Sequence, residues 1–520
     1  MIHRDRRSCG TERRLLALMA AVALLGTALP GVIGRGIGGS GGISGSGASA
    51  ASGGAESFDS ARMPDDAEMS GSTGMTAGGA APAKSVDDAA SVKLYDSVVS
   101  AKSGGGTVPD KACAAIPVAA RGSSRVPLRT DGVRALWIAS AYSIDYPSGD
   151  GGCIAELRAE IYRIVKNAAD MGMNAIFFQV RPAADALYRS DIFPVSAALG
   201  GELPFGFDPL TELCTAAHSR DISVLAWVNP LRVTLSVCET REQALASLPV
   251  SSPAALHPEY CAFPGGRLWF DPGYPEVRRL VADGVAEIVR EYPVDGVVFD
   301  DYFYPYPSAA DGWDDSDSYA RYGGGAELDD FRRANINELI ALCSEAVHGA
   351  ANDGIVNGGA VNSGAADAVA TVDGVRCVFG VSPFGIWRNS SLDPRGSDTR
   401  GFSAYDGIYA DALEWVRTRA VDFLSPQIYF RRDDPAAPAL ELMRWWGDAT
   451  AGSGVPLIFS LADYKASLWQ DGGEVAEQER LSRDISGCIG CAHYGYGALC
   501  ANDFGVRSCL AAAVPVQPAQ

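Results

Sequence analysis

Short apolar runs alternate with amphipathic stretches from residue 133 onward, and this alternation restricts the fold more than any other feature. Over roughly 370 residues, eight β-type runs alternate with stretches that have the apolar spacing of a helix. Eight such units match a (β/α)8 TIM barrel, an α/β fold, here with loop insertions. A doubly wound open sheet is the alternative, but a glycine-rich phosphate turn is missing after the first strand.

The predicted strands share β-branched and aromatic residues and are bounded by polar or glycine-containing turns. They cover residues 133–140, 174–180, 223–229, 295–301, 376–381, 422–429, 456–461 and 492–499. The predicted helices cover residues 154–171, 208–219, 275–292, 328–348, 408–418, 437–446 and 474–485.

The chain before the barrel has the composition of a targeting segment followed by a spacer. Residues 1–33 join an arginine-rich flank to an apolar stretch, which indicates a signal peptide or an uncleaved membrane anchor. Residues 34–126 are rich in Gly, Ser and Ala and too poor in large apolar residues to form a core, so we expect a disordered spacer. The barrel domain is predicted at residues 127–510. We therefore expect an exported protein, extracellular or associated with the cell envelope, which the N-terminal segment would tether if it is an anchor.

Charge and cysteine content narrow the partners and the cofactors. The net charge of −20 argues against nucleic acid, because phosphate binding needs a basic surface. Twelve cysteines in an exported chain permit disulfides, and Cys238 and Cys261 flank an insertion that a disulfide between them would close. For the CxxC pair of Cys488 and Cys491 we expect disulfides or buried thiols rather than a metal site.

The predicted C-terminal strand ends carry the polar and aromatic residues from which a TIM-barrel active site is built. Asp300 and Asp301 directly follow the fourth strand, in DGVVFDDYFYPYP, and are the candidate catalytic residues. Carboxylates transfer protons, amides and arginines hold hydroxyl groups, and aromatic rings stack on sugar faces, so this set of residues fits a polysaccharide. We expect neither a metal site nor a cofactor, because no His or Cys cluster accompanies them. The candidate substrate-binding residues are Arg181, Asp185, Asn229, Asp271, Tyr302, Tyr304, Trp387, Gln427, Tyr429 and Asp463.

Several of these candidates have a structural alternative. Asp271 precedes Pro-Gly and is equally suited to capping that loop. Arg181 and Asp185 either form an ion pair with each other or hold the substrate. Asp463 ends the seventh strand, where many barrel glycosidases have their nucleophile. The candidate aromatic residues serve either as stacking platforms or as loop packing.

Eight sequence blocks resemble the signature blocks of the glycosyl hydrolase-like 10 family and occur in the family's order over about residues 131–465. They are RPAADALYRSDIFPVS, AWVNPLRV, HPEY, LWFDPGYPEVR, DGVVFDDYFYPYP, FGVSPFGIWRN, SAYDGIYAD and VDFLSPQIYF. The resemblance implies a TIM barrel and a glycoside hydrolase of bacterial envelopes. It also implies a substrate, namely peptidoglycan glycan strands that have lost their stem peptides.

Glycoside hydrolysis commonly uses one carboxyl group as general acid and a second as base or nucleophile. Alternation with Gly296 and Val298 places Asp300 inward and leaves Asp301 on the following loop. For a substrate with N-acetyl groups, Asp300 would orient the acetamide and Asp301 would protonate the leaving oxygen. The main alternative is an envelope protein that binds glycan without cutting it. A third class, a metal-dependent deacetylase, would need His ligands, and none of the five His residues lies at a predicted strand end.

Overall fold

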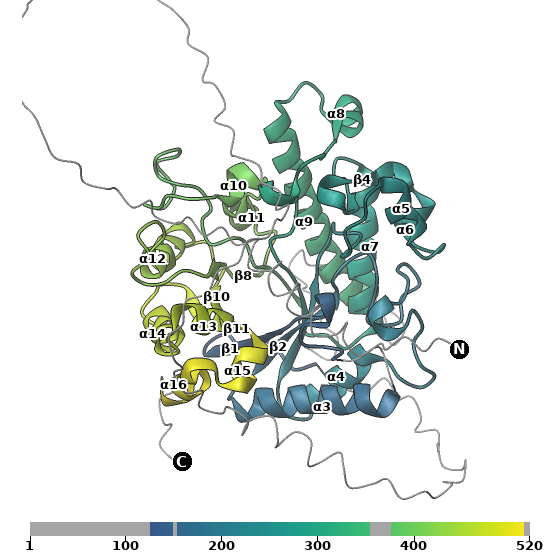
Figure 1. The fold of residues 1–520 in the computed structure, drawn as a ribbon. Helices are drawn as coiled ribbons and strands as arrows, with labels where there is room; N and C mark the ends of the chain where they lie inside the picture. Colours follow the sequence, from purple (N-terminus) through teal and green to yellow (C-terminus); the bar gives the residue numbers. More distant parts are fainter. Residues whose placement is uncertain (1–124, 149–152, 354–375, 514–520) are drawn as a thin grey trace, which may run out of the picture. The chain divides into compact units, whose positions relative to one another are not determined.

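A closed ring of parallel strands forms the centre of the computed structural model, which describes residues 125–148, 153–353 and 376–513 (Figure 1). The strands follow the order β11-β1-β2-β3-β6-β7-β8-β10, and β10 also pairs with β11, so the sheet closes into a barrel. β8 and β9 share one position, because both pair with β10 and only Ser425 and Pro426 separate them. Proline has no N–H to donate, which explains the break in this strand. The predicted (β/α)8 barrel is thereby confirmed.

The barrel strands are β1 (Val133–Ile138), β2 (Ala175–Arg181), β3 (Ser223–Val228), β6 (Gly296–Phe299), β7 (Val378–Val381), β8 (Phe423–Leu424), β9 (Gln427–Ile428), β10 (Leu457–Ala462) and β11 (Cys488–Tyr494). A separate antiparallel pair, β4 (Cys261–Ala262) and β5 (Trp269–Phe270), lies in the insertion after β3.

The longer helices lie outside the strands, as Figure 1 shows for α3, α7, α9, α12 and α14. The helices are α3 (Ile154–Asp170), α4 (Pro209–His218), α5 (Arg241–Ala246), α6 (Pro253–Leu256), α7 (Pro275–Glu291), α8 (Ser316–Tyr322), α9 (Leu328–Asp353), α10 (Ala404–Gly407), α11 (Ala412–Thr418), α12 (Ala439–Ala449), α13 (Ala466–Trp469), α14 (Gly473–Ser482), α15 (Tyr496–Ala501) and α16 (Val506–Ala513). No helix of these described parts is long and apolar enough to cross a membrane.

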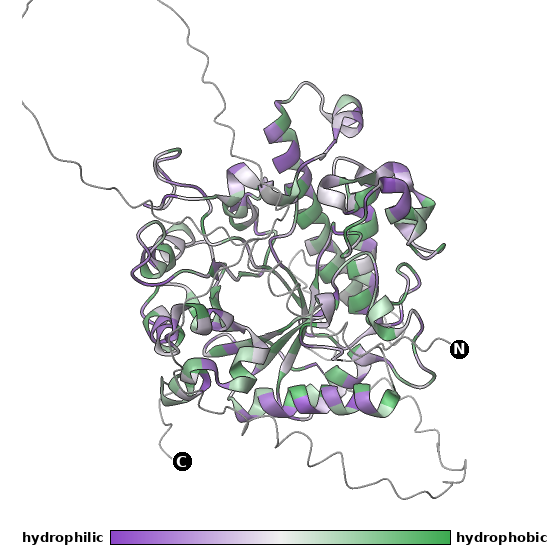
Figure 2. Cartoon of the chain, in the orientation of Figure 1, coloured by the Kyte–Doolittle hydropathy of each residue, from purple (hydrophilic) through white to green (hydrophobic). Residues whose placement is uncertain are grey.

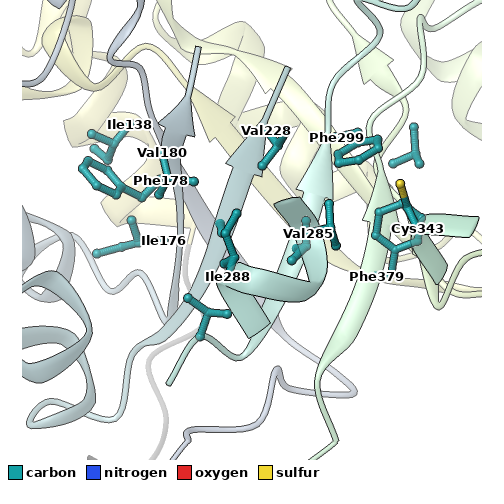
Figure 3. Packing of buried hydrophobic residues seen from close by; sticks show 14 of the residues in the cluster. Ile138, Ile176, Phe178, Val180, Val228, Val285, Ile288, Phe299, Cys343 and Phe379 are labelled. Atoms are coloured by element: carbon teal, nitrogen blue, oxygen red, sulfur yellow. The ribbon is translucent and has the colours of Figure 1, made fainter. Parts of the chain in front are cut away.

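Strand alternation divides the apolar residues between two cores. One core fills the inside of the barrel and includes Trp137, Phe177, Trp227 and Val298. The other core lies between the strands and the helices, where Figure 3 shows Phe178 and other strand residues facing the helices. Figure 2 shows hydrophobic and hydrophilic residues alternating along α3, as expected for a helix with one buried face. Because the inside is filled with side chains, a ligand has access only at the ends of the barrel.

Three polar residues tie the N-terminal ends of neighbouring strands together. Each immediately precedes a strand, donates its backbone N–H to the second residue of the adjacent strand, and accepts that residue's N–H on its side chain. Asn174 binds β1 in this way, Asp295 binds β3, and Asp422 binds β7. His218 at the end of α4 pairs with Asp295 at 2.8 Å, and His348 in the C-terminal part of α9 pairs with Asp422 at 2.9 Å. These contacts fix the register at the end of the barrel opposite to the candidate site.

The segment of residues 125–128 lies at the same N-terminal end. The backbone N–H of Val126 donates to Oδ1 of Asp295 at 2.7 Å, and the carbonyl of Pro127 accepts from Ser223 at 3.2 Å. Leu128 packs against the core inside the barrel. The segment therefore helps to close this end of the barrel. Residues 1–33 and nearly all of residues 34–126 lie outside the described ranges, so the signal segment and spacer remain predictions.

Two expectations from the sequence were wrong. The eighth strand covers residues 488–494 instead of 492–499, because Gly495 with φ of 127° ends it and Tyr496 begins α15. Cys238 and Cys261 are both free thiols, as are the other cysteines of the described residues. A hydrogen bond of 2.8 Å from the backbone N–H of Cys238 to the carbonyl of Gly266 holds this part of the insertion instead.

Replacing Asp295 with alanine is expected to destabilise the protein by about 3 kcal/mol. Its side chain is fully buried, and its loss leaves the N–H groups of Val126 and Val224 and the ring of His218 without their acceptor. The free energy of unfolding from urea titration measures the effect. Asp170→Ala, which removes an exposed ion pair with Lys166 on α3, is the control and should change the free energy by less than about 0.5 kcal/mol. Equal small effects of both variants would contradict the role assigned to Asp295.

Candidate active site

Asp300 lies directly after β6 and is held from the side of β3. Its Oδ2 accepts hydrogen bonds from Nε1 of Trp227 at 3.0 Å and from Nδ2 of Asn229 at 2.6 Å. Its Oδ1 accepts the backbone N–H of Tyr302 at 3.3 Å. Trp227 belongs to the core inside the barrel, and so does Val298, two residues before Asp300. The inward orientation predicted for Asp300 agrees with these contacts.

Asp301 is held from the other side of the rim, by which we mean the C-terminal ends of the barrel strands. Its Oδ2 accepts the O–H of Tyr306, and the side chain of Gln427 at the start of β9 also donates to the carboxylate. Nε2 of Gln427 lies 3.2 Å from the carbonyl of Ser382, which follows β7. The two adjacent carboxylates are therefore bound by different parts of one rim.

Burial dominates the electrostatics of both carboxylates. Asp300 is 4% exposed and Asp301 is 2% exposed. Burial raises the pKa of Asp300 to about 7; the negative charge of Asp301 adds to this, whereas Arg232 and the hydrogen bonds from Tyr302 and Asn229 oppose it. Burial also raises the pKa of Asp301, which the hydrogen bonds from Tyr306 and Gln427 lower. The pair is thus suited to hold a proton near neutral pH, as a general acid must.

Four tyrosines, the tyrosine cluster, lie beside the carboxylates and are partly exposed: Tyr302, Tyr429, Tyr464 and Tyr494. The rings of Tyr429 and Tyr494 are stacked, with centroids 6.2 Å apart and an interplanar angle of 16°. Tyr464 meets both rings edge-on, at 6.1 and 5.5 Å. The negative charge of Asp301 raises the pKa of Tyr302, Tyr429 and Tyr464, although burial is the larger cause. This arrangement offers aromatic faces next to paired acids, as a sugar-binding site requires.

Several residues at the site were absent from the sequence-based candidates. They include Tyr306, Arg232, Tyr464 and Tyr494, together with Trp227 of β3 and Gln179 of β2. Trp227 donates to Asp300, and its ring meets Trp137 edge-on at 4.9 Å. Gln179 of β2 donates from Nε2 to Oδ1 of Asn229 at 2.6 Å. Both residues occupy inward positions near the ends of their strands. Alternation from Phe177 identifies Gln179 as an inward residue, but the prediction for this strand placed the candidate at its end, at Arg181.

Asp185 lies in the loop after β2 and is partly exposed. Its carboxylate accepts a hydrogen bond from Ser196, and its Oδ1 has no hydrogen-bond partner. The positive charge of Arg232 opposes the rise that burial causes in the pKa of Asp185. The guanidinium of Arg232 lies 5.0 Å from the ring centroid of Tyr302. The same cation therefore acts on Asp185 and contacts a tyrosine of the rim.

The structure does not direct Arg181 and Asp463 toward the carboxylate pair. The register of β2 shifts between Gln179 and Arg181, so Arg181 pairs with Val228, which faces the helices. Its guanidinium lies 4.0 Å from the ring centroid of Phe193 and packs against α7. The fully buried Asp463 accepts from Nδ1 of His493 at 3.2 Å, in the layer that also contains α14. Among the ion pairs of the described residues, none joins Arg181 to Asp185.

Three further candidates have contacts typical of loop packing. Oδ1 of Asp271 accepts the backbone N–H of Gly273 at 2.8 Å, which is the capping contact considered as the alternative. The ring of Tyr304 is 2% exposed and is covered by Trp313 and Tyr409. Trp387 is 1% exposed, and its Nε1 donates to Asp411 at 3.0 Å. Neither aromatic ring has a face open to a ligand.

No group of three or more His, Cys, Asp or Glu side chains that could hold a metal ion occurs within the described ranges. Of the residues expected from the sequence, the structure brings Asp300, Asp301, Asn229 and Gln427 into contact at the rim, with the tyrosine cluster beside them. Chemically, this set supplies two coupled carboxyl groups, fixed amide donors and aromatic surface.

Comparison with known proteins gives a consistent picture. The family model described as glycosyl hydrolase-like 10 matches residues 132–355 and 369–471. The chain is 33% identical over 398 residues to "Glycosyl hydrolase YngK" of Bacillus subtilis (strain 168), covering 74% of this chain and 72% of the relative. It is 36% identical over 346 residues to "Glycosyl hydrolase DigH" of Escherichia coli (strain K12), covering 64% of this chain and 73% of the relative.

Solved structures are similar at a much lower level. The glycoside hydrolase domain of PgaB (BpsB) from Bordetella bronchiseptica has 15% identity and a TM-score of 0.48, with coverage of 73% of this chain and 99% of that domain. The catalytic domain of a β-amylase from Paenibacillus polymyxa has 11% identity and a TM-score of 0.46, with coverage of 75% and 100%.

The raised pKa of Asp300 predicts a specific pH dependence of stability. Because the pKa of about 7 in the folded state exceeds the usual value of about 4, the contribution of Asp300 is greatest below pH 4. That contribution is lost as pH rises through 7, at no more than about 1.4 kcal/mol per pH unit. Asp300→Asn has no such group, so its melting temperature should fall less between pH 5 and 8 than that of the wild type. Thermal melting at constant ionic strength tests this, and parallel curves for both proteins would refute it.

Proposed function

Because this chain belongs to the glycosyl hydrolase-like 10 family and is a glycoside hydrolase, we propose that it cleaves peptidoglycan glycan strands of the bacterial cell envelope. The observation that carries the proposal is the buried pair Asp300 and Asp301 at the end of β6, beside the tyrosine cluster. Coupled carboxyl groups and aromatic faces suit a chain of sugars, and the family blocks in the sequence favour glycan that has lost its stem peptides.

We assign the two carboxyl groups different roles in the reaction. Asp300 accepts from Trp227, Asn229 and the backbone of Tyr302, so its position is well defined. Such a group suits the orientation of a substrate acetamide, whose oxygen then attacks the anomeric carbon. Asp301 protonates the leaving glycosidic oxygen, which departs with that proton. Water then opens the cyclic intermediate and gives one of its own protons to Asp301, which restores the acid. The raised pKa of Asp301 supports its role as the donor.

Export completes the proposal. The arginine-rich flank and apolar stretch of residues 1–33 support passage through a membrane, and the composition of residues 34–126 supports a long spacer. Either a cleaved signal peptide or a retained anchor would bring the barrel to a cell-wall substrate.

Activity on two forms of peptidoglycan tests the substrate and the catalytic pair together. The wild type should release new reducing ends from glycan stripped of its peptides, and fewer from peptide-bearing peptidoglycan. Asp300→Asn and Asp301→Asn should each lower kcat by about 100-fold or more, because proton transfer and substrate orientation are lost. The exposed Asp170→Asn is the matched control and should keep full activity.

The same incubation separates the alternatives. Binding to glycan without new reducing ends would identify a non-catalytic envelope protein and refute hydrolysis. Full activity of both Asp300→Asn and Asp301→Asn would refute the assigned pair while leaving the enzyme class unaffected.

Loss of one ring from the tyrosine cluster should weaken substrate binding more than it slows the chemical step. We expect Tyr464→Ala to raise KM by about tenfold, equivalent to about 1.4 kcal/mol, because it removes stacking surface. Tyr464→Phe keeps the ring and should remain close to wild type. Tyr162→Ala on α3, where the side chain is 50% exposed, controls for the loss of a surface tyrosine. Steady-state kinetics on a defined oligosaccharide provides the measurement. An unchanged KM for Tyr464→Ala would exclude this ring as a platform.

A further inference from the structure

A chain of hydrogen bonds with a fixed direction runs from the end of β1 to Asp300. Oε1 of Gln179 accepts two backbone N–H groups, those of Ser140 and Ala141, both at 2.8 Å. Backbone N–H groups can only donate, so the oxygen of the Gln179 amide must face them. Its Nε2 is thereby directed at Asn229, where it donates to Oδ1 at 2.6 Å.

The orientation of Asn229 follows from that of Gln179. Because Oδ1 of Asn229 accepts from Gln179, its Nδ2 faces the other way and donates to Oδ2 of Asp300 at 2.6 Å. Gln179 and Asn229 are each 1% exposed, so water does not compete for these bonds. The oxygen and nitrogen of an isolated Asn amide are nearly interchangeable in shape, and here the donor Nε2 of Gln179 on one side and the acceptor Oδ2 of Asp300 on the other distinguish them.

The opposite orientation of Asn229 would be unfavourable for the site. A flipped amide would place Oδ1 against Oδ2 of Asp300, which replaces a hydrogen bond with the repulsion of two acceptors. We propose that Gln179 is a positioning residue, which locks the amide of Asn229 in the one orientation that donates to Asp300. This inference rests on the proposed function for its catalytic meaning, because it concerns the same carboxylate.

The proposal predicts that the pKa of Asp300 rises when Gln179 no longer orients the amide of Asn229. The charged or titratable groups that act on Asp300 are Asp301, Tyr302, Tyr306, Arg232 and Tyr494. None of them is altered by a substitution at Gln179. A shift in the titration of Asp300 would therefore report on Asn229, whereas a purely space-filling role of Gln179 would leave the titration unchanged.

Two substitutions of Gln179 distinguish the loss of its hydrogen bond to Asn229 from the effect of an added charge. Gln179→Glu keeps the shape and the acceptor for Ser140 and Ala141, but its ionised form cannot donate to Asn229. Gln179→Met has a similar length, carries no charge and removes the same donor. We expect both to raise the midpoint of Asp300 by about one pH unit or more. Gln243→Glu on α5, at an exposed position in the insertion after β3, is the matched control and should leave the midpoint unchanged.

Two measurements report the titration midpoint of Asp300. The first is the pH profile of kcat/KM on stripped glycan. The second needs no activity: the melting temperature of each variant is compared from pH 5 to 9 with that of the same variant carrying Asp300→Asn. The difference isolates the titration of Asp300. In the background of Asn229→Ala, Gln179→Met should no longer shift the midpoint, because its effect passes through Asn229.

The outcomes distinguish this inference from the proposed function. If Gln179→Met and Gln179→Glu fold and keep the wild-type midpoint, or if Gln179→Met still shifts it in the Asn229→Ala background, the positioning role is overturned. If the wild type cuts no glycan but the melting curves show the expected shifts, the proposed function fails and the positioning role stands. If the substitutions at Gln179 prevent folding, Asn229→Ala alone decides, and an unchanged midpoint for Asp300 overturns the inference.

Discussion

Two carboxylates buried side by side impose the main physical requirement on this rim. Removing a charged group from water is costly, and placing a like charge beside it adds to that cost. The protein compensates mostly with neutral donors: Asp300 has an indole, an amide and a backbone N–H, and Asp301 has a phenol and an amide. Arg232 is the cation whose charge opposes the rise in the pKa of Asp300. This balance leaves the pair close to protonation at neutral pH, where a general acid works best.

The two ends of the barrel use acidic residues in different ways. At the N-terminal end, Asp295 and Asp422 exchange backbone hydrogen bonds with a neighbouring strand and pair with a histidine. Their position before a strand determines which backbone groups they meet. At the rim, Asp300 and Asp301 follow a strand that ends at Phe299. Their carboxylates are held by side chains from β3 and β9 and from the loop after β6 itself. A TIM barrel commonly separates stability and activity in this way.

The sequence predicted the barrel and the inward position of Asp300 because both follow from strand alternation, a local property. It failed where distant parts of the chain decide. The register shift after Gln179 turns Arg181 toward the helices, and no pattern within that strand reveals it. The position of Asp463 at a strand end predicted a place in the site. Instead, His493, thirty residues later, binds its carboxylate in the layer between the strands and the helices. Trp387 lies after a strand, as expected of a platform, yet its ring is 1% exposed and packs against Tyr405 and Trp445.

The first described residues of the chain meet the barrel at the end opposite to the candidate site. Val126 and Pro127 bind Asp295 and Ser223 at the N-terminal ends of β6 and β3, whereas the carboxylate pair lies beyond the C-terminal end of β6. These two residues and the rim are at opposite ends of the parallel strands. Residues 125–128 therefore add to the contacts that close the N-terminal end of the barrel and lie away from the carboxylate pair. The loops that follow the strands carry the candidate site, so the contacts that stabilise the barrel and the residues suited to chemistry are separated along the strand axis, as is common in this fold.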